Sequence, residues 1–184
     1  MLPGRAPVGT PRMAELLANK WLSYRFAVEH GLPVVPTAAD TAGGLALADA
    51  HGWPLIVKPR CGYGSQGVRL VFEPAQLQRL LAEGDWVVQP FVNPEAGWEQ
   101  GLPDLSKGIA LWYSYRDPGQ YALVVRIAPE GAVTFMGATL NTMVCGRPER
   151  SVRADDAALA QVGHAYGRAA SSAGWRGVLN VQCR

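Results

Sequence analysis

The sequence predicts an α+β protein, and two patterns along the chain carry that prediction. In the first half, helical periodicity and short β-type runs follow in the order helix, helix, strand, loop, strand, helix. In the second half, three β-type segments with hairpin spacing precede one helix and a final strand. With 184 residues, the chain is long enough for one domain or two small lobes.

The first predicted helix runs from about Arg12 to His30, and Gly31 provides its C-terminal cap. Its apolar residues recur at helical spacing, which places Leu17, Trp21, Tyr24 and Val28 on one face.

Further helices and strands complete the first half. Asp40 or Thr41 caps a short helix that ends at His51, although two glycines near its start weaken this prediction. Pro74 opens a helix that ends at Gly84. The predicted strands are Pro54–Lys58, Val68–Phe72 and Trp86–Val92. Because Pro90 cannot donate to a ladder, the third strand belongs at a sheet edge or where the chain passes between lobes.

The second half is predicted to be mostly β. A loop over Asn93–Gly108 leads into three strands, at Ile109–Arg116, Tyr121–Ala128 and Ala132–Ala138, with turns at Asp117–Gly119 and Pro129–Gly131. The charged run with Arg147, Glu149, Arg150 and Arg153 is interpreted as a solvated loop, with binding of a substrate carboxylate or phosphate as the alternative. A helix over Asp155–Ser172 and a strand over Gly177–Gln182 follow.

The most informative stretch is LIVKPRCGYGSQGVRLV, from Leu55 to Val71. It places Lys58 in an apolar strand, directly before a loop that contains Gly62, Gly64 and Gly67. Glycines let backbone N–H groups approach anionic oxygens, and the lysine adds a full positive charge beside them. The stretch therefore predicts a site for a polyphosphate.

Two common glycine-rich motifs do not fit this loop. The glycines at 62, 64 and 67 match the dinucleotide fingerprint GxGxxG, but that motif must open a helix, and here a β-type run follows. No glycine is followed by Lys and then Ser or Thr, which excludes a P-loop. A plain hairpin turn remains the alternative, although three glycines and a serine exceed what a turn requires.

Composition narrows the function classes. The net charge of +2 gives no reason to expect nucleic acid or a membrane as partner, and no apolar run could span a bilayer. Cys61, Cys145 and Cys183 are widely spaced, which argues against a disulfide framework or a structural zinc site and fits the cytoplasm. The oligomeric state stays open.

Four motifs in order resemble the ATP-grasp superfamily, particularly the branch that includes the large chain of carbamoyl-phosphate synthase. They are Asn19-Lys20 with HGLPVVPT, then WPLIVKPRCGYGSQGV, WVVQPFV, and GRAASSAGWRGVLNVQCR at the C-terminal end. The resemblance covers about Asn19–Arg184 and is weakest between Asn93 and Gly119. It implies two α+β lobes that clasp a nucleotide.

The resemblance also implies roles for individual residues and the cofactors ATP and Mg²⁺. Lys20 and Lys58 would contact ATP phosphates, with Lys58 also near the adenine. A loop covering the β- and γ-phosphates would consist of Gly62, Gly64, Ser65 and Gly67, and an adenine slot of Gln89, Phe91 and Val92. Gln182 would help to hold magnesium. Without the resemblance, Lys20 would be interpreted as a solvated surface residue, Gln89 as an edge-strand polar residue and Gln182 as a partner of neighbouring backbone.

The implied activity is that of a carboxylate–amine or carboxylate–thiol ligase that works through an acylphosphate, with small-molecule substrates. The expected organisation is a leader and remnant of a preceding domain over residues 1–18, a lid lobe over 19–88 and a partial second lobe over 89–184. The family's Glu and Asn metal ligands, on the strand after Gln182, have no counterpart before the last residue. The family's ribose-binding Glu is replaced by Gln120, with Glu99 as a weaker candidate.

These departures lead to the expectation that this chain alone binds nucleotide weakly and lacks efficient catalysis. Two alternatives stay open. One is a non-catalytic nucleotide-binding module that regulates a partner, and the other, more distant, is a Rossmann oxidoreductase.

Overall fold

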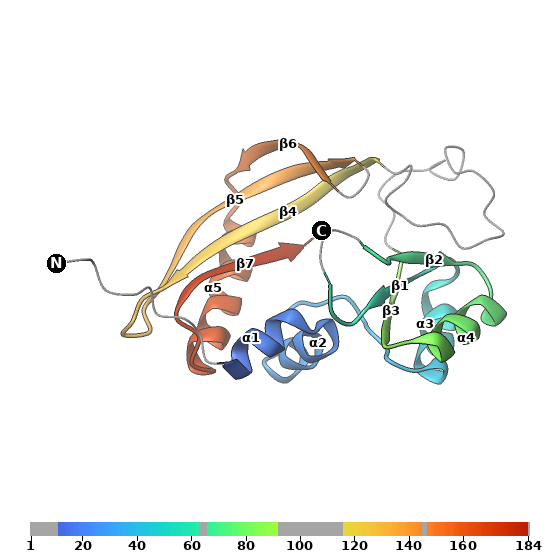
Figure 1. The fold of residues 1–184 in the computed structure, drawn as a ribbon. Helices are drawn as coiled ribbons and strands as arrows, with labels where there is room; N and C mark the ends of the chain where they lie inside the picture. The colour runs from blue at the N-terminus through green and yellow to red at the C-terminus, as the bar shows by residue number, and fades with distance from the viewer. Residues whose placement is uncertain (1–10, 63–65, 92–115, 145–146, 184) are drawn as a thin grey trace.

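Two antiparallel sheets, each covered by helices on one face, make up the computed structural model (Figure 1). The structure describes residues 11–62, 66–91, 116–144 and 147–183. The α+β prediction is confirmed for these residues. The predicted loop at 93–108 and most of the predicted strand at 109–116 lie outside the described residues.

The smaller sheet has the order β2-β1-β3, from β1 (Leu55–Pro59), β2 (Arg69–Val71) and β3 (Trp86–Pro90). Helices α3 (Thr41–His51) and α4 (Pro74–Glu83) cover one face of it (Figure 1). The helix-facing positions form a buried cluster that includes Leu55, Val57, Val71, Leu77 and Val88. β3 is an edge strand of this sheet, as its proline predicts, and it spans the expected lobe boundary between residues 88 and 89.

Strand alternation decides what the other face of this sheet presents. Since Leu55 and Val57 point to the helices, Ile56 and Lys58 point away from them. Ile56 packs there against Leu70, and the register pairs Ile56 with Gln89. The helix-free face of the small sheet therefore carries a buried apolar cluster together with one lysine and one amide.

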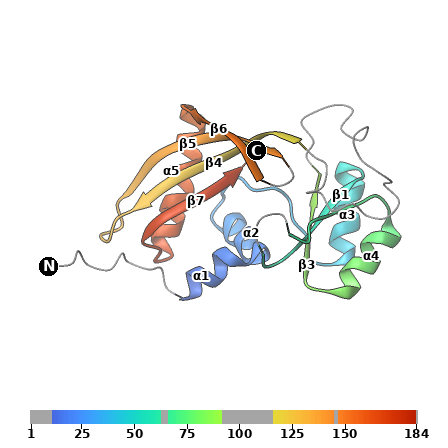
Figure 2. The same ribbon diagram turned by 45° about the horizontal axis from the view of Figure 1, so that its top comes forward.

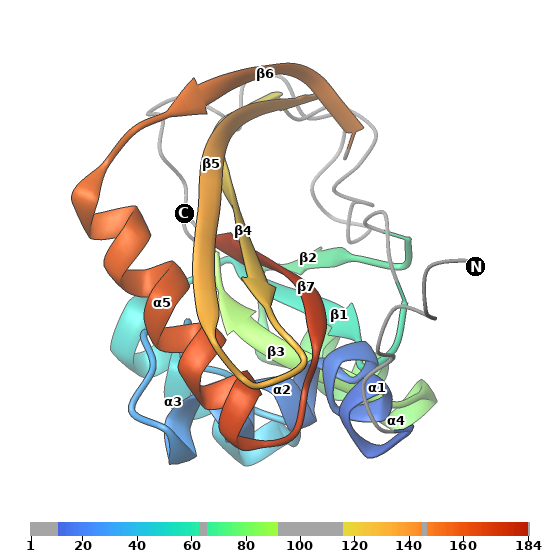
Figure 3. The same cartoon turned by 90° about the vertical axis from the view of Figure 1, so that its left-hand side faces the viewer.

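The larger sheet has the order β6-β5-β4-β7. It consists of β4 (Arg116–Ile127), β5 (Val133–Val144), β6 (Arg147–Ala154) and β7 (Gly177–Cys183). Helix α5 (Ala157–Ser172) lies across one face of it (Figure 3). Asp156 caps this helix by accepting a hydrogen bond from the Ala158 N–H at 2.7 Å.

Helices α1 (Pro11–Ala18) and α2 (Lys20–Glu29) lie near both sheets (Figure 2). Ala27 of α2 is buried against α5, where it forms a cluster with Leu32 and Ala169. The Tyr166 hydroxyl on α5 donates to the Pro33 carbonyl at 2.7 Å. From there the chain crosses to the small sheet, where Ala38 and Val88 exchange two backbone hydrogen bonds of 2.9 Å.

The structure corrects the predicted first helix. The expected single helix from Arg12 to His30 is broken at Asn19, whose extended backbone and capping side chain start a new helix. The predicted common face is also wrong, because Leu17 lies on α1 and the other three residues on α2, and Leu17 is 39% and Val28 55% exposed while Ala27 is buried. The break shifts the helical phase, so the periodicity read across it does not describe one face.

Two predictions in the second half are wrong as well. The expected turn at Asp117–Gly119 lies inside β4, which absorbs it through a register shift between Asp117 and Gln120. The charged run interpreted as a loop is strand β6, an edge strand paired only with β5 among the described elements. Charged side chains are common on edge strands, because they discourage further pairing.

No helix in the described ranges is long and apolar enough to cross a membrane.

Candidate functional site

A chain of side-chain hydrogen bonds crosses the helix-free face of the small sheet. Lys58 Nζ on β1 donates to Gln89 Oε1 on β3 at 2.7 Å. Gln89 Nε2 donates to Thr37 Oγ1 at 2.8 Å, and the Thr37 hydroxyl donates to the Val35 carbonyl at 2.9 Å. Lys58 and Gln89 are diagonal neighbours on paired strands, which is within reach of long side chains. The predicted Lys58 and Gln89 are therefore brought together.

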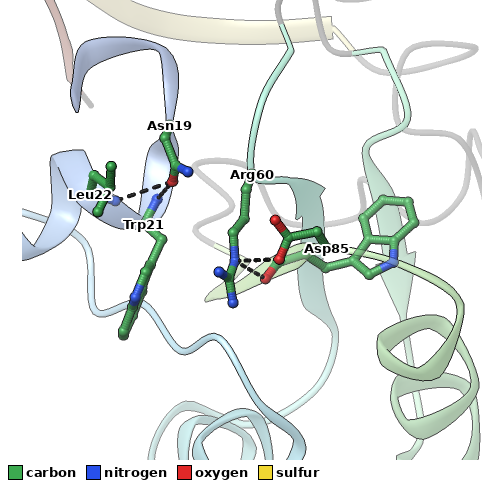
Figure 4. Close-up of polar contacts among 6 residues, drawn as sticks. Asn19, Trp21, Leu22, Arg60 and Asp85 are labelled. Atoms are coloured by element: carbon green, nitrogen blue, oxygen red, sulfur yellow. Dashed lines mark hydrogen bonds and ion pairs between the residues drawn. The ribbon is translucent and has the colours of Figure 1, made fainter. Parts of the chain in front are cut away.

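The backbone directly after β1 is held from two sides. The Arg60 N–H donates to the Asp85 carbonyl at 3.0 Å, and the Arg60 carbonyl accepts from the Lys20 N–H at 2.8 Å. The Arg60 guanidinium also pairs with the Asp85 carboxylate, with 2.9 Å between Nε and Oδ1 (Figure 4). Since Asp85 is 70% exposed, that ion pair adds little stability, and the backbone bonds do most to fix the base of the glycine loop.

The second predicted lysine is anchored to the same segment. Asn19 forms an antiparallel bridge with Cys61, and Lys20 Nζ donates to the Gly62 carbonyl at 3.0 Å. Lys58 belongs to β1 and Lys20 begins α2, and 38 residues separate them in the sequence. Both are nevertheless associated with the segment that runs from the end of β1 into the glycine loop. Lys58 thus lies just before this segment, on β1, and the Lys20 ammonium contacts its last described residue.

The N-terminus of α2 does not add an anion site of its own. Asn19 Oδ1 accepts from the Trp21 and Leu22 N–H groups at 3.0 and 3.2 Å (Figure 4). The Lys20 N–H bonds to Arg60, and the Ser23 N–H donates to the Asn19 carbonyl at 2.9 Å. The first-turn donors that a helix usually offers to an anion are thus already used. Charge at this place comes from the lysine side chains.

Partial burial lowers the pKa of Lys20 from its ordinary value of 10.5, and the neighbouring Cys61 opposes this shift when its thiol is ionised. The folded protein thus holds the Lys20 ammonium less favourably than the unfolded chain does. A ligand phosphate would supply the opposite charge that this ammonium lacks, so the site is electrostatically suited to an anion.

The Lys20 shift gives a pH dependence of stability. Between the lowered folded pKa and 10.5, the unfolded chain binds more protons, so the Lys20 contribution to the free energy of unfolding rises with pH. We expect the free energy of unfolding of Cys61→Ser to increase with pH relative to that of the double variant Cys61→Ser/Lys20→Met through this window. Urea unfolding at several pH values measures it, and parallel pH profiles for the two variants would contradict it.

The glycine loop is described in part. Gly62 has φ +134° and Gly67 has φ +74°, a region that side-chain-bearing residues rarely adopt, so both positions require glycine. A Cβ at Gly67 would also lie 2.8 Å from Pro59 Cγ. Gly64 and Ser65 lie outside the described residues, so their predicted contact with phosphate stays a prediction.

The predicted adenine slot is also described in part. Phe91 is half-buried and packs against the cluster of Ile56, Val68 and Leu70 on the helix-free face. Val92 lies outside the described residues. Ile56, Val68 and Leu70 are themselves buried, so Phe91 is the side chain of the predicted slot that is partly exposed beside this cluster.

The predicted metal ligand Gln182 lies on the other sheet. It is an exposed residue of β7 and pairs with Ala122 of β4. β7 ends on the side of the large sheet that faces the small sheet (Figures 1 and 2). Gln120 pairs with Asn141 within the large sheet, and Glu99 lies outside the described residues.

A protein-held magnesium site does not emerge from the described ranges. No three His, Cys, Asp or Glu side chains gather there as a metal site. One amide oxygen, from Gln182, is not a donor set that holds Mg²⁺, which prefers carboxylates together with substrate phosphates.

Sequence reasoning missed Thr37, which is buried with 7% of its surface exposed. It also did not predict the ion pair and the backbone hydrogen bond between Arg60 and Asp85. Thr37 closes the run HGLPVVPT, and a hydroxyl that follows a proline and an apolar run was the available signal, because a buried hydroxyl needs a polar partner.

A family model supports the interpretation of the small-sheet region. Residues 19–96 match the family described as "Carbamoyl-phosphate synthase L chain, ATP binding domain". The carbamoyl phosphate synthase large chain of Streptomyces avermitilis is 34% identical over 79 residues, which is 41% of this chain and 7% of that protein. This chain therefore spans only a small part of that relative's length.

Solved structures resemble nearly the whole chain. The N5-carboxyaminoimidazole synthetase of Staphylococcus aureus, complexed with ADP, gives a TM-score of 0.68 at 18% identity and covers 92% of this chain and 41% of its own. A second structure is the biotin carboxylase domain of the 2-oxoglutarate carboxylase of Hydrogenobacter thermophilus, complexed with MgADP, ADP and bicarbonate. Its TM-score is 0.69 at 16% identity, and the match covers 93% of this chain and 37% of that one. At these identities the likeness concerns the fold.

Proposed function

Because the chain has the ATP-grasp fold and its residues 19–96 match an ATP-binding domain, we propose that it binds ATP as part of a carboxylate–amine or carboxylate–thiol ligase. The single observation that carries the proposal is that Lys58 directly precedes the segment that opens the glycine loop, while the Lys20 ammonium is bonded to Gly62 within it. In this proposal the phosphates lie at that end of the small sheet.

The base lies further along the same face. Half-buried Phe91 offers an apolar side chain that is backed by the buried Ile56 and Leu70, and Gln89 offers an amide on the same face. The nucleotide would thus run from Phe91 and Gln89 to the glycine loop, with Lys58 between the two ends. Val92, Gly64 and Ser65 keep the roles that the resemblance gives them, as adenine-slot and phosphate-loop residues.

Lysines at this position fit the chemistry of phosphoryl transfer. In the proposed reaction a substrate carboxylate oxygen attacks the γ-phosphorus, and the bond to the β,γ-bridging oxygen breaks as ADP leaves. An amine or thiol then attacks the acyl carbon of the acylphosphate, and inorganic phosphate leaves. Protein catalysis of the first step consists mainly of positioning and charge stabilisation, which two lysines supply.

Magnesium enters this proposal with the nucleotide. Mg²⁺ is commonly held by substrate phosphates and one or two protein oxygens, which would leave Gln182 as one protein ligand. The carbonyl oxygen of Gln182 would have to meet the phosphates from the large sheet, across from the two lysines. The bound ion would neutralise phosphate charge that develops during transfer.

A non-catalytic nucleotide-binding module is the second candidate. Release of phosphate from ATP, measured with bicarbonate and with simple carboxylates and amines present, separates the two. Sustained turnover supports the ligase, while binding without turnover supports the module.

Calorimetric titration with ATP and ADP, in the presence of magnesium, tests the shared core of both candidates. We expect the 184-residue chain to bind both nucleotides and Lys58→Ala to bind them much more weakly. A folded chain that binds neither nucleotide, or a Lys58→Ala variant that binds as the wild type does, would contradict the proposal.

A further inference from the structure

Thr37 is tied to the sheet that carries Lys58 and Gln89 by the backbone. Ala38 and Val88 exchange N–H to carbonyl bonds of 2.9 Å in both directions, which fixes the antiparallel register of residues 37 and 38 against β3. That register sets Thr37 beside Gln89, although 52 residues separate them in the sequence. The position of the Thr37 hydroxyl therefore does not depend on side-chain flexibility alone.

The hydrogen bonds give this contact a defined polarity. A threonine hydroxyl carries one proton, and the proton of Thr37 goes to the Val35 carbonyl at 2.9 Å. The Thr37 oxygen is then an acceptor, and it receives Gln89 Nε2 at 2.8 Å. The Gln89 amide must consequently turn its oxygen the other way, toward Lys58 Nζ at 2.7 Å.

The opposite amide orientation would be unfavourable at both ends. It would set the Gln89 N–H group against the Lys58 ammonium, so that two donors face each other. It would also leave the Gln89 oxygen facing a hydroxyl whose proton is already used. When a phosphate competes for the Lys58 ammonium, the hold of Lys58 on Gln89 weakens, and the Thr37 contact is what keeps the amide in place.

We propose that Thr37 is a positioning residue of the nucleotide site, which fixes the amide orientation of Gln89 and through it the place of the Lys58 ammonium. This inference rests on the proposed function, since it assigns Thr37 to the same site. Thr37 itself touches no ligand in this scheme. It acts through Gln89, so its contribution should disappear when residue 89 no longer has an orientation to fix.

Four variants of the full chain test this logic by calorimetry with ATP and magnesium. Thr37→Val keeps the shape but removes the hydroxyl, and should weaken ATP binding by about tenfold. Thr37→Ser keeps the hydroxyl and should recover most of that loss. In Gln89→Glu both side-chain oxygens are acceptors, so adding Thr37→Val to that variant should cost less than about threefold.

A merely structural role would give another pattern. If Thr37→Val only loosened the fold, it would cost the same in the wild-type and Gln89→Glu backgrounds, and that result would overturn the inference. An unchanged ATP affinity in Thr37→Val, with Lys58 still required, would overturn it too while leaving the proposed function intact. If Lys58→Ala bound ATP as tightly as the wild type, both the Thr37 inference and the proposed function would be overturned.

One measurement needs no variant at position 37. In the free wild-type protein, one proton of the Gln89 side-chain amide should exchange with solvent more slowly than an exposed glutamine, as NMR can show once Gln89→Glu has assigned the signal. If both amide protons exchange as in free glutamine, the contact with Thr37 is absent and the inference fails. This holds even if Thr37→Val does not fold.

Discussion

Replacing Lys58 by alanine is expected to weaken ATP binding by about 100-fold, because one hydrogen bond from an ammonium to a charged group contributes about 1.5 to 3 kcal/mol. The lysine lies on the helix-free face, beside the segment that opens the glycine loop. Its removal takes one of two positive charges from the proposed phosphate position. Titration calorimetry at constant ionic strength measures the change.

A matched control separates this effect from a change in net charge. Arg79 is exposed on α4, which covers the opposite face of the same sheet, and Arg79→Ala removes one positive charge there. We expect its ATP affinity to stay within about twofold of the wild type, since surface charges beyond about 10 Å are screened. Equal losses in both variants would mean that Lys58 acts through net charge and not through contact.

The sequence was sufficient for elements whose signals are local. Asp40 caps α3 and Pro74 opens α4, as predicted, because caps and prolines act within one turn. The glycines that weakened the α3 prediction turn out to serve packing: a Cβ on Gly44 would lie 2.9 Å from Leu77 Cδ2 on α4. Tertiary contact there outweighs low helix propensity.

Features that depend on residues distant in the sequence were not predicted. Asn19 is a preferred N-cap residue, but the apolar spacing continues across it, and the helix break there coincides with an antiparallel bridge to the distant Cys61. The charged run of β6 is a strand that pairs with β5. The local pattern of charges does not predict this pairing. Local propensity cannot report on a partner that is distant in the sequence.

In the candidate site, too, local features were predicted from the sequence and contacts between distant residues were not. The presence of Lys58 in an apolar strand before glycines was visible in the sequence, whereas the positive φ of Gly62 and Gly67 comes from the structure. The sharing of one amide between Lys58 and Thr37 was not visible, since it arises from the register of β1, β3 and the crossing segment. Contacts of Lys20, Gln89, Phe91 and Gln182 with a nucleotide or metal stay predictions.

Replacing Gly167 by alanine is expected to lower the free energy of unfolding by about 2 kcal/mol, against the usual preference of helices for alanine. That preference is worth about 1 kcal/mol in an exposed helix. At Gly167, however, the new Cβ would lie 2.5 Å from Val133 Cγ1 and 2.7 Å from Val125 Cγ1, where α5 meets the large sheet. Overpacking of this kind costs about 1 to 3 kcal/mol, because the helix must move away from β4 and β5.

A double-mutant cycle attributes the loss to this contact. Val133→Ala removes the nearer methyl, so Gly167→Ala should cost less in that background than in the wild type, with a coupling of about 1 kcal/mol. The rescue stays partial because Val125 remains. Gln161→Ala, on the exposed side of α5, should change stability by less than about 0.5 kcal/mol. A stabilising Gly167→Ala in urea unfolding would show that α5 stands further from the sheet than these distances imply.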